Sequence, residues 1–382
     1  MLRLIALLPV LIWLYLLIGR GGFWRMARQL ALASATDHVA ASVVAVVPAR
    51  NEAQVIGAAV QSLLRQQFRG RLHVIVVDDG SDDGTAGHAL AAAAAAGGVG
   101  RLTVIDGTPP PADWRGKLWA MAQGAAAAQA LAPDFLLFTD ADIQHAPRAL
   151  AALVANAEAQ RCDLLSCMVQ LQAGSKAERW LIPAFVFLFF LLYPPAWVAS
   201  GRRRTAAAAG GCMLMRPAML ERIGGLTAIR GQIIDDCALA RAVKSHGGRL
   251  WLGLTRQSSS LRPYGSAASI GQMISRTAFN QLHHSYTLLL ATLVGLFLTY
   301  ELPLLLLFSS DTVITILGLA ALALMSLTYL PTVRFYKVSA CWALALPAVA
   351  LFYAAATMHS ALQYARGRGG RWKGRAQDGR VP

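Results

Sequence analysis

Charged residues are scarce in this sequence. Asp, Glu, Lys and Arg together make up 14% of its 382 residues, whereas hydrophobic residues make up 56%. Soluble enzymes carry more charge than this, so the composition indicates several membrane segments. The length leaves room for one α/β domain of about 200–250 residues in addition to these segments.

Acidic residues are fewer than basic residues. The sequence has 20 Asp and Glu and 35 Lys and Arg, which gives a formal net charge of +15. The basic residues gather beside apolar segments, at 20–28, 202–204 and 366–375. This placement fits anionic lipid headgroups and the excess of basic residues on the cytoplasmic side of membrane proteins. No aromatic-basic motif of the kind that binds nucleic acid occurs. We therefore expect a membrane as partner and no nucleic acid.

Cysteine and glycine motifs are missing as well. The five cysteines form no Cys-x-x-Cys pair and no His–Cys spacing suited to zinc, which predicts buried thiols in a reducing compartment. No G-x-G-x-x-G follows the first predicted strand, and no G-x-x-x-x-G-K-[ST] occurs. The sequence therefore argues against a Rossmann dinucleotide site and against a P-loop.

The apolar run at residues 2–18 has Arg3 and Arg20 at its ends. It is short for a membrane span, but snorkelling arginines can extend it. A cleaved signal peptide is the alternative. The basic residues Arg20, Arg25 and Arg28 favour an N-terminal anchor at 1–20 that is retained, with its C-terminal end in the cytoplasm.

Three further apolar runs, at 286–308, 312–330 and 340–358, are each long enough to span a membrane and predict C-terminal transmembrane helices at 286–360. Arg334 and Lys337 favour the cytoplasm for the second connection. Three full crossings would leave the basic tail at 361–382 outside, against the same rule. The third run, which contains Pro347, is therefore our candidate for a re-entrant segment.

Between these ends the pattern is that of an α/β domain. Residues 42–48 predict a strand, 54–66 a helix and 72–77 a second strand, which ends in the acidic loop 78–85. Such a βαβ unit is typical of a parallel, doubly wound sheet. The carboxylates of the acidic loop can accept hydrogen bonds from a base N–H and from ribose hydroxyls.

A further short apolar run, at 135–138, predicts a third buried strand, which is followed by two carboxylates, Asp140 and Asp142. Side chains two apart on extended backbone point the same way, so both carboxylates could bind one Mg²⁺ or Mn²⁺ ion. The alternative is a solvated turn after the strand. Lys117, at the start of a predicted helix, could contact phosphate or could simply be solvated.

The apolar residues 181–198 would form a transmembrane helix by hydropathy alone. A single crossing, however, would put Asp140 and Asp142 on one side of the membrane and Asp235 and Asp236 on the other. We therefore predict that 181–199 is an interfacial or re-entrant element, which could deliver a lipid acceptor to the site.

Three motifs carry a resemblance to a known family. VVPARNE, VVDDGSDDGT and TDAD, in this order, resemble glycosyltransferase family 2, with its GT-A nucleotide-sugar-binding α/β fold. The resemblance implies a catalytic domain at 40–280. It implies donor binding by Pro48, Glu52, Asp78, Asp79, Asp140 and by Lys117 of the GKLWA stretch. It also implies that Asp140 and Asp142 bind the metal.

The same resemblance assigns the catalytic base. The family often has Glu-Asp where this chain has Asp235-Asp236, with the second residue as base, so Asp236 inherits that role. Direct displacement needs such a carboxylate to take the proton of the acceptor hydroxyl, and it inverts the anomeric configuration. The alternative is that both residues cap the following helix, and the two roles are compatible.

One stretch departs from the family. Polymerising members carry Q-x-x-R-W, whereas this chain has QMISRTAF, with the spacing one longer and no tryptophan. This weakens the case for processive polysaccharide synthesis. Arg276 is then either a diphosphate or lipid contact, or an ordinary interfacial arginine.

Further stretches, among them TDADIQHAP, RRRTAAAAGGCMLMRP and LRPYGS, resemble the hopene-associated glycosyltransferases, a bacterial subgroup. The resemblance implies an inner-membrane enzyme that faces the cytoplasm, depends on Mg²⁺ or Mn²⁺ and moves a sugar from a nucleotide sugar, with a UDP-sugar favoured, to a lipid. The alternatives are a nucleotidyl- or phosphoglycosyl-type transferase on the same fold and a non-catalytic membrane scaffold.

Overall fold

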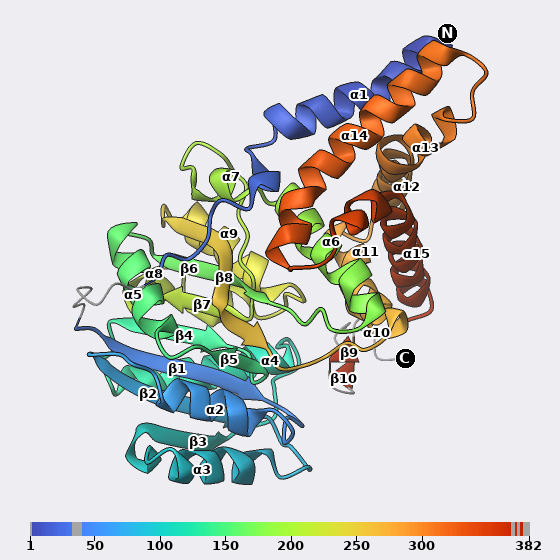
Figure 1. Cartoon of the computed structure of the whole chain (residues 1–382). Helices are drawn as coiled ribbons and strands as arrows, with labels where there is room; N and C mark the ends of the chain where they lie inside the picture. Colours follow the sequence, from blue (N-terminus) through green and yellow to red (C-terminus); the bar gives the residue numbers. More distant parts are fainter. Residues whose placement is uncertain (1, 33–39, 368–370, 373–374, 377–382) are drawn as a thin grey trace. The chain divides into compact units, whose positions relative to one another are not determined.

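The computed structural model describes residues 2–32, 40–367, 371–372 and 375–376 (Figure 1). Contacts divide the chain into two compact units. The sheet unit comprises Arg28–Gln172 and Trp197–Arg262, and the helical unit comprises Met1–Ala27, Ala173–Ala196 and Pro263–Pro382. Most of the predicted basic tail, from residue 368 onward, lies outside the described residues apart from the short strands β9 (Arg371–Trp372) and β10 (Arg375–Ala376).

The sheet unit contains an eight-stranded sheet with strand order β3-β2-β1-β4-β7-β6-β8-β5. Its parallel part consists of β1 (Ser42–Ala49), β2 (Arg71–Asp78), β3 (Leu102–Asp106) and β4 (Phe135–Thr139). All eight residues of β1 are buried, as expected of a central parallel strand with helices on both faces. The strands predicted at 42–48, 72–77 and 135–138 are thus confirmed.

The other half of the sheet is mixed. It consists of β7 (Cys212–Met215), β6 (Leu164–Gln170), β8 (Leu250–Ser260) and β5 (Ile143–His145). Strand β7 is antiparallel to both of its neighbours, β4 and β6. The parallel sheet that the sequence predicted is therefore only half of the structure, because strand direction depends on how the chain returns to the sheet and not on a local pattern.

Helices cover both faces of the parallel strands. The helices of the sheet unit are α2 (Ile56–Leu64), α3 (Thr85–Ala95), α4 (Gly116–Gln129), α5 (Ala149–Ala159), α8 (Pro217–Arg222) and α9 (Asp235–Ser245). The short 3₁₀ turns η2 (Val99–Arg101) and η3 (Leu226–Ile229) lie between them, and α7 (Pro195–Ala199) spans the boundary between the units.

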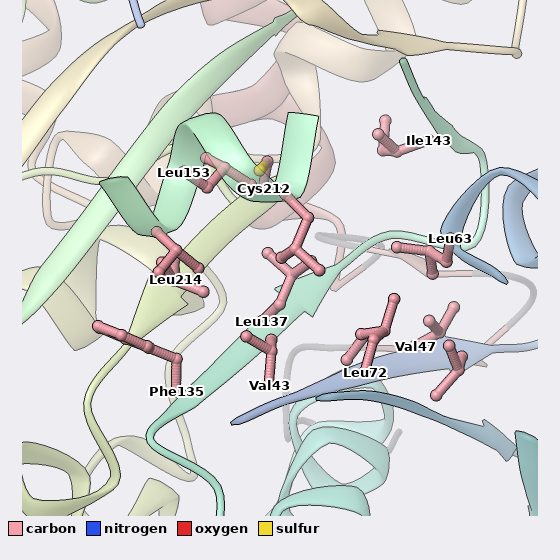
Figure 2. Close-up of a cluster of buried hydrophobic side chains, with 14 of the residues drawn as sticks. Val43, Val47, Leu63, Leu72, Phe135, Leu137, Ile143, Leu153, Cys212 and Leu214 are labelled. Atoms are coloured by element: carbon pink, nitrogen blue, oxygen red, sulfur yellow. The ribbon is translucent and has the colours of Figure 1, made fainter. Parts of the chain in front are cut away.

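Successive side chains of β1 point to opposite faces of the sheet. Val43 and Val47 belong to one buried cluster together with Leu63 of α2 and Leu153 of α5 (Figure 2). On the other face α4 approaches closely at Gly124, where a Cβ atom would lie 2.4 Å from Val46 Cγ1. This packing fixes the carboxyl end of β1, and with it the loop that carries Glu52.

The helical unit is built from apolar helices. They are α1 (Leu2–Ile18), α6 (Lys176–Leu192), α10 (Ala267–Ser275), α11 (Ala278–Gln281), α12 (Tyr286–Leu296), α13 (Leu302–Leu306), α14 (Thr312–Phe335) and α15 (Leu346–Ala365). The 3₁₀ turns η1 (Phe23–Arg25) and η5 (Ala340–Ala345) and the π-helical segment η4 (Phe297–Glu301) belong to the same unit. Helix α1 packs along α14 (Figure 1).

Among the described residues, three helical stretches are long and apolar enough to cross a membrane: Tyr286–Leu306, Thr312–Phe335 and Ala340–Ala365. They coincide with the three runs predicted from the sequence. Pro347 lies in the first turn of α15, directly after η5, where a proline is tolerated. Helix α1 is shorter, at 17 residues. The number of crossings and the re-entrant third run stay predictions.

The apolar run at 181–198 forms most of α6, which begins with a capping box. The Ser175 hydroxyl accepts from the Glu178 N–H at 3.1 Å, and the Glu178 carboxylate accepts from the Ser175 N–H at 2.8 Å. The same carboxylate accepts from the N–H groups of Tyr264 and Gly265. The helix is 17 residues long and ends before Pro194 and Pro195, and its interfacial or re-entrant placement stays a prediction.

All five cysteines are free, and four of them, Cys162, Cys167, Cys212 and Cys237, are buried. The prediction of buried thiols is confirmed for these four. It is wrong for Cys341, which is exposed in η5.

Candidate active site at the carboxyl edge of the sheet

The carboxyl ends of β1, β2 and β4 meet at one edge of the sheet, because these strands are parallel neighbours. Glu52 follows β1, Asp78 ends β2, and Asp140 follows β4. Pro48 is buried inside β1 and paired with Val77. Four of the predicted donor-binding positions thus lie at or behind the edge where open α/β sheets bind ligands.

The loops after β1 and β2 are joined by hydrogen bonds from backbone N–H groups to side-chain oxygens. Asn51 has a φ of +50°, and its N–H donates to Ser81 Oγ at 2.9 Å. In return its side-chain oxygen accepts from the Asp82 N–H at 3.1 Å. The Glu52 N–H donates to Thr85 Oγ1 at 2.9 Å. The backbone of Glu52 is therefore fixed before any ligand binds.

Asp78 and Asp79 are both buried. Asp78 Oδ1 accepts from the Ser81 N–H at 3.0 Å and from the Ser81 hydroxyl. Asp79 Oδ2 lies 3.8 Å from Arg50 Nη1. These contacts give both carboxylates a structural role in the acidic loop, and their contact with a nucleoside stays a prediction.

The backbone between Asp140 and Asp142 is not extended, so the premise on which both side chains were predicted to point the same way is wrong, and their binding of one metal ion stays a prediction. Ala141 and Asp142 lie in a turn, and the Ile143 N–H donates to the Asp140 carbonyl at 3.1 Å. The two carboxylates consequently have different partners. The reason is β5, which begins at Ile143 and forces the chain to turn directly after β4.

Lys117 lies in the first turn of α4 and pairs with acidic side chains from two other elements. Its Nζ is 2.6 Å from Asp140 Oδ1 and 4.0 Å from Asp235 Oδ2. Burial alone would lower the pKa of Lys117, but Asp140, Asp235 and Asp236 outweigh it and raise that pKa. With 21% of its side chain exposed, Lys117 is not the solvated residue of the alternative interpretation.

Asp236 lies beside this lysine and accepts two backbone hydrogen bonds. Its Oδ2 accepts from the Gly210 N–H at 2.8 Å, and its Oδ1 from the Cys237 N–H at 2.6 Å. Burial and the neighbouring charge of Asp235 raise the pKa of Asp236 to about 6, although Lys117 and the two N–H groups oppose the shift. Such a carboxylate is ionised at neutral pH and basic enough to take a proton.

The capping interpretation of Asp235 and Asp236 is wrong in one respect. The N-cap residue of α9 is Ile234, and the two aspartates occupy the first turn. Asp236 still accepts from a first-turn N–H, and both charges lie at the positive end of the helix dipole.

Gly210 leaves space for these two groups. A Cβ atom at this position would lie 3.3 Å from Asp236 Oδ2 and 3.5 Å from Lys117 Nζ. Gly210 thus allows the backbone to come close to the predicted base, and the segment before it is fixed to the same helix. Lys244, in the last turn of α9, donates to the carbonyls of Val198 at 2.8 Å and Thr205 at 2.6 Å.

Arg262 is a residue of this edge that the sequence interpretation missed. Its Nη2 pairs with the Glu52 carboxylate, and its Nε is 3.4 Å from Asp142 Oδ2. The only signal was its place in LRPYGS, one of the stretches with a family resemblance. No spacing rule connects it to Glu52, which is 210 residues away.

His145, the last residue of β5, is buried and connects β4 to β8 through hydrogen bonds of its ring. Its Nε2 is 3.1 Å from Thr139 Oγ1, and its Nδ1 is 2.8 Å from Ser258 Oγ. Burial lowers the pKa of His145 to about 4, so the ring is neutral. Thr139 Oγ1 donates its one proton to the Gly211 carbonyl at 2.9 Å, so it can only accept from His145 Nε2–H. Nδ1 of the neutral ring then has no proton and accepts from the Ser258 hydroxyl.

The residues fit a divalent ion of the kind that the sequence predicted. Within the described part of the chain, no three His, Cys, Asp or Glu side chains form a group that could enclose a metal. Mg²⁺ and Mn²⁺ do not need one, since one or two carboxylates suffice when phosphate oxygens and waters complete the shell. Asp140 and Asp142 can supply these two carboxylates.

Arg276 follows α10 as its C-cap residue and belongs to the helical unit. Its predicted contact with donor or lipid stays a prediction.

Comparisons with known proteins identify the family and the fold of this chain. The model of the family described as "Glycosyltransferase like family 2" matches residues 40–274. The mannosyltransferase PcManGT from Pyrobaculum calidifontis, solved with GDP-Man and Mn²⁺, is 19% identical, with a TM-score of 0.52 over 95% of this chain and 99% of that chain. S. aureus TarS 1-349, solved with UDP-GlcNAc, is 14% identical, with a TM-score of 0.38 over 87% and 95%. A search of curated proteins gave no match. The likeness to PcManGT shows a shared GT-A-type fold.

Proposed function

This chain belongs to glycosyltransferase like family 2, and from that premise we propose a metal-dependent, inverting enzyme that moves a sugar from a nucleotide sugar to a lipid. The observation that carries the proposal is the meeting of Asp236, Lys117 and Asp140 from three separate elements at the carboxyl edge of the sheet. A base, a cation and a metal-binding carboxylate are what a single displacement at an anomeric carbon needs.

In this mechanism Asp236 takes the proton of the acceptor hydroxyl as the oxygen attacks the anomeric carbon. The Gly210 and Cys237 N–H groups keep its carboxylate oriented. Lys117 supplies a positive charge for the leaving diphosphate. Asp140 and Asp142 would hold a divalent ion, which when bound neutralises charge on that diphosphate. The loops with Glu52, Asp78 and Asp79 would hold the nucleoside, and a UDP-sugar is our proposed donor.

Two features support a lipid acceptor. The helical unit contains three helices long and apolar enough to cross a membrane. In the sheet unit Arg202, Arg203 and Arg204 are exposed. Their loop is held at both ends by Lys244 of α9, which donates to the carbonyls of Val198 and Thr205. These arginines could bind headgroup phosphates, and their loop is thereby attached to the helix that carries the predicted base, Asp236. A bacterial inner-membrane location, a cytoplasmic sheet unit and a link to hopanoid biosynthesis rest on the sequence resemblance and the distribution of basic residues.

The test uses the purified full-length protein in detergent with Mn²⁺, a panel of UDP- and GDP-sugars, and a bacterial polar-lipid extract. We expect release of nucleoside diphosphate that requires both metal and lipid. Pyrophosphate release would indicate a nucleotidyltransferase instead. A folded protein that binds no nucleotide and releases neither product would contradict the proposal and favour a scaffold.

The rate should depend on pH through Asp236. Because its pKa is raised to about 6 and the base must be ionised, kcat/KM should be constant above about pH 7 and fall about tenfold per unit well below the pKa. Lys117 stays protonated over this range because its pKa is raised. The measurement is kcat/KM from pH 4.5 to 8. A flat profile down to pH 5 would contradict the assignment of this base.

A further inference from the structure

We propose that Arg262 competes with the metal ion for Asp142 and thereby couples metal binding to diphosphate binding. Its guanidinium lies between two carboxylates that belong to different loops. Nη2 pairs with Glu52 of the loop after β1, and Nε is 3.4 Å from Asp142 Oδ2 in the turn after β4. This inference rests on the proposed function for the identity of the second ligand, a nucleoside diphosphate.

The two carboxylates are more enclosed than the arginine. The exposed fractions of the side chains are 12% for Glu52, 18% for Asp142 and 40% for Arg262. Partly buried charges interact more strongly than solvated ones, so each carboxylate needs a nearby positive charge. Arg262 supplies that charge to both, and its exposure leaves the guanidinium free to rotate toward another acceptor.

The backbone around Arg262 is held in place, so only its side chain has to move. The Leu261 N–H donates to the Asp142 carbonyl at 2.7 Å. The Ser260 hydroxyl donates to Asp142 Oδ2 at 3.0 Å, and the Arg262 N–H donates to Ser260 Oγ at 3.2 Å. The arginine therefore stays within reach of the turn whether or not its side chain is paired.

An ion held by the Asp142 carboxylate would lie close to the Arg262 guanidinium, which faces Oδ2 of the same carboxylate. Two positive charges on one carboxylate repel each other, so the ion alone would bind at the expense of the Arg262–Asp142 contact. A diphosphate removes this penalty, because its oxygens bind the ion and offer a guanidinium new acceptors. Metal and nucleoside diphosphate should therefore each raise the affinity of the other.

Lys117 pairs with the other predicted metal-binding carboxylate and differs from Arg262 in its further contacts. It pairs with Asp140 at 2.6 Å but also faces Asp235 and Asp236, and 21% of its side chain is exposed. When an ion approaches Asp140, these other carboxylates keep Lys117 in place. Of Lys117 and Arg262, the arginine is therefore the one that we expect to leave its carboxylate when an ion binds.

The test measures Mn²⁺ binding by electron paramagnetic resonance of the free ion, with the full-length protein in detergent. Arg262→Gln removes the competing charge, so we expect Mn²⁺ alone to bind about tenfold tighter than in the wild type, within the usual range of coupling between sites. The gain in Mn²⁺ affinity caused by saturating UDP or GDP should shrink toward onefold. These two changes have opposite signs, which a loss of folded protein cannot produce.

Two further variants serve as controls. Arg101→Gln removes an exposed arginine just before β3, at the amino edge of the parallel strands, and should bind Mn²⁺ like the wild type with and without nucleotide. Glu52→Gln leaves Arg262 with Asp142 as its carboxylate partner, so Mn²⁺ alone should bind more weakly. This variant also decides the matter if Arg262→Gln does not fold.

Three outcomes would overturn the inference and leave Arg262 as a structural contact between the two loops. Arg262→Gln could bind Mn²⁺ more weakly than the wild type, or nucleotide could raise the Mn²⁺ affinity of both proteins equally. The third outcome is that neither the wild type nor Arg262→Gln binds Mn²⁺. Failure of the proposed function looks different. In that case neither UDP nor GDP changes Mn²⁺ binding to the wild type, while the comparison of Mn²⁺ alone in wild type, Arg262→Gln and Glu52→Gln still shows whether the arginine competes with the ion.

Discussion

Replacing Asp236 with asparagine is expected to lower kcat by about 10²- to 10⁴-fold, the usual contribution of a positioned general base. An amide cannot take the proton of the acceptor hydroxyl. Affinity for the nucleotide should change little, because the contacts of Asp236 are with the protein's own Gly210 and Cys237 N–H groups. Initial rates at saturating donor, together with the nucleotide dissociation constant, separate the two effects.

Asp235→Asn is the matched control, since it removes the neighbouring charge of the same turn and leaves both hydrogen bonds of Asp236. Loss of that charge lowers the pKa of Asp236, because Asp235 is one of the causes that raise it. The acid limb of the pH profile should therefore move to lower pH, with a smaller loss of rate than in Asp236→Asn. Equal losses in the two variants, or an Asp236→Asn rate within a few-fold of wild type, would contradict the base assignment.

The second large effect is expected for the turn after β4. Asp142→Asn and Asp140→Asn should each reduce Mn²⁺-dependent transfer by at least about 10²-fold, since a metal ion supplies several kcal/mol of stabilisation to the charge on a leaving diphosphate. The loss should be partly restored by higher Mn²⁺ concentrations, because a weakened site still binds at saturation. Rates as a function of Mn²⁺ concentration provide the measurement.

Asp106→Asn is the control for this pair. Asp106 ends β3 at the same edge of the sheet but is exposed and was not predicted to bind donor or metal. It should keep the wild-type rate and the wild-type Mn²⁺ dependence. If Asp142→Asn behaves like Asp106→Asn, the carboxylates belong to a solvated turn, and a metal site must be sought elsewhere.

The sequence predicts the parallel strands well because each is a short, continuous apolar run. Residues 42–48 and 135–138 become β1 and β4 almost to the residue. Strand β8 has no such pattern, since Ser258 and Ser260 in its second half are polar and buried. They are stabilised there by His145 and Asp142, contacts between residues more than 100 positions apart that no local pattern records.

The residues of the candidate site also differ in whether a local sequence pattern predicts them. Asp140, Lys117 and Asp236 were predicted from motifs, and the structure brings them together. The turn between Asp140 and Asp142 was only the alternative interpretation, because the direction of a side chain after a strand depends on where the next strand pairs. Arg262 was missed because its importance lies in two carboxylates that reach it only after folding.

The burial of the cysteines has a practical consequence. Cys341, in the η5 turn between α14 and α15, is the one exposed thiol among the five, and the other four lie in the core. The unmodified protein therefore carries a natural single-site label. Under the proposed membrane placement, a maleimide that cannot cross a bilayer would react with this thiol from one compartment only, so labelling of intact cells and of inverted vesicles would test on which side the connection lies.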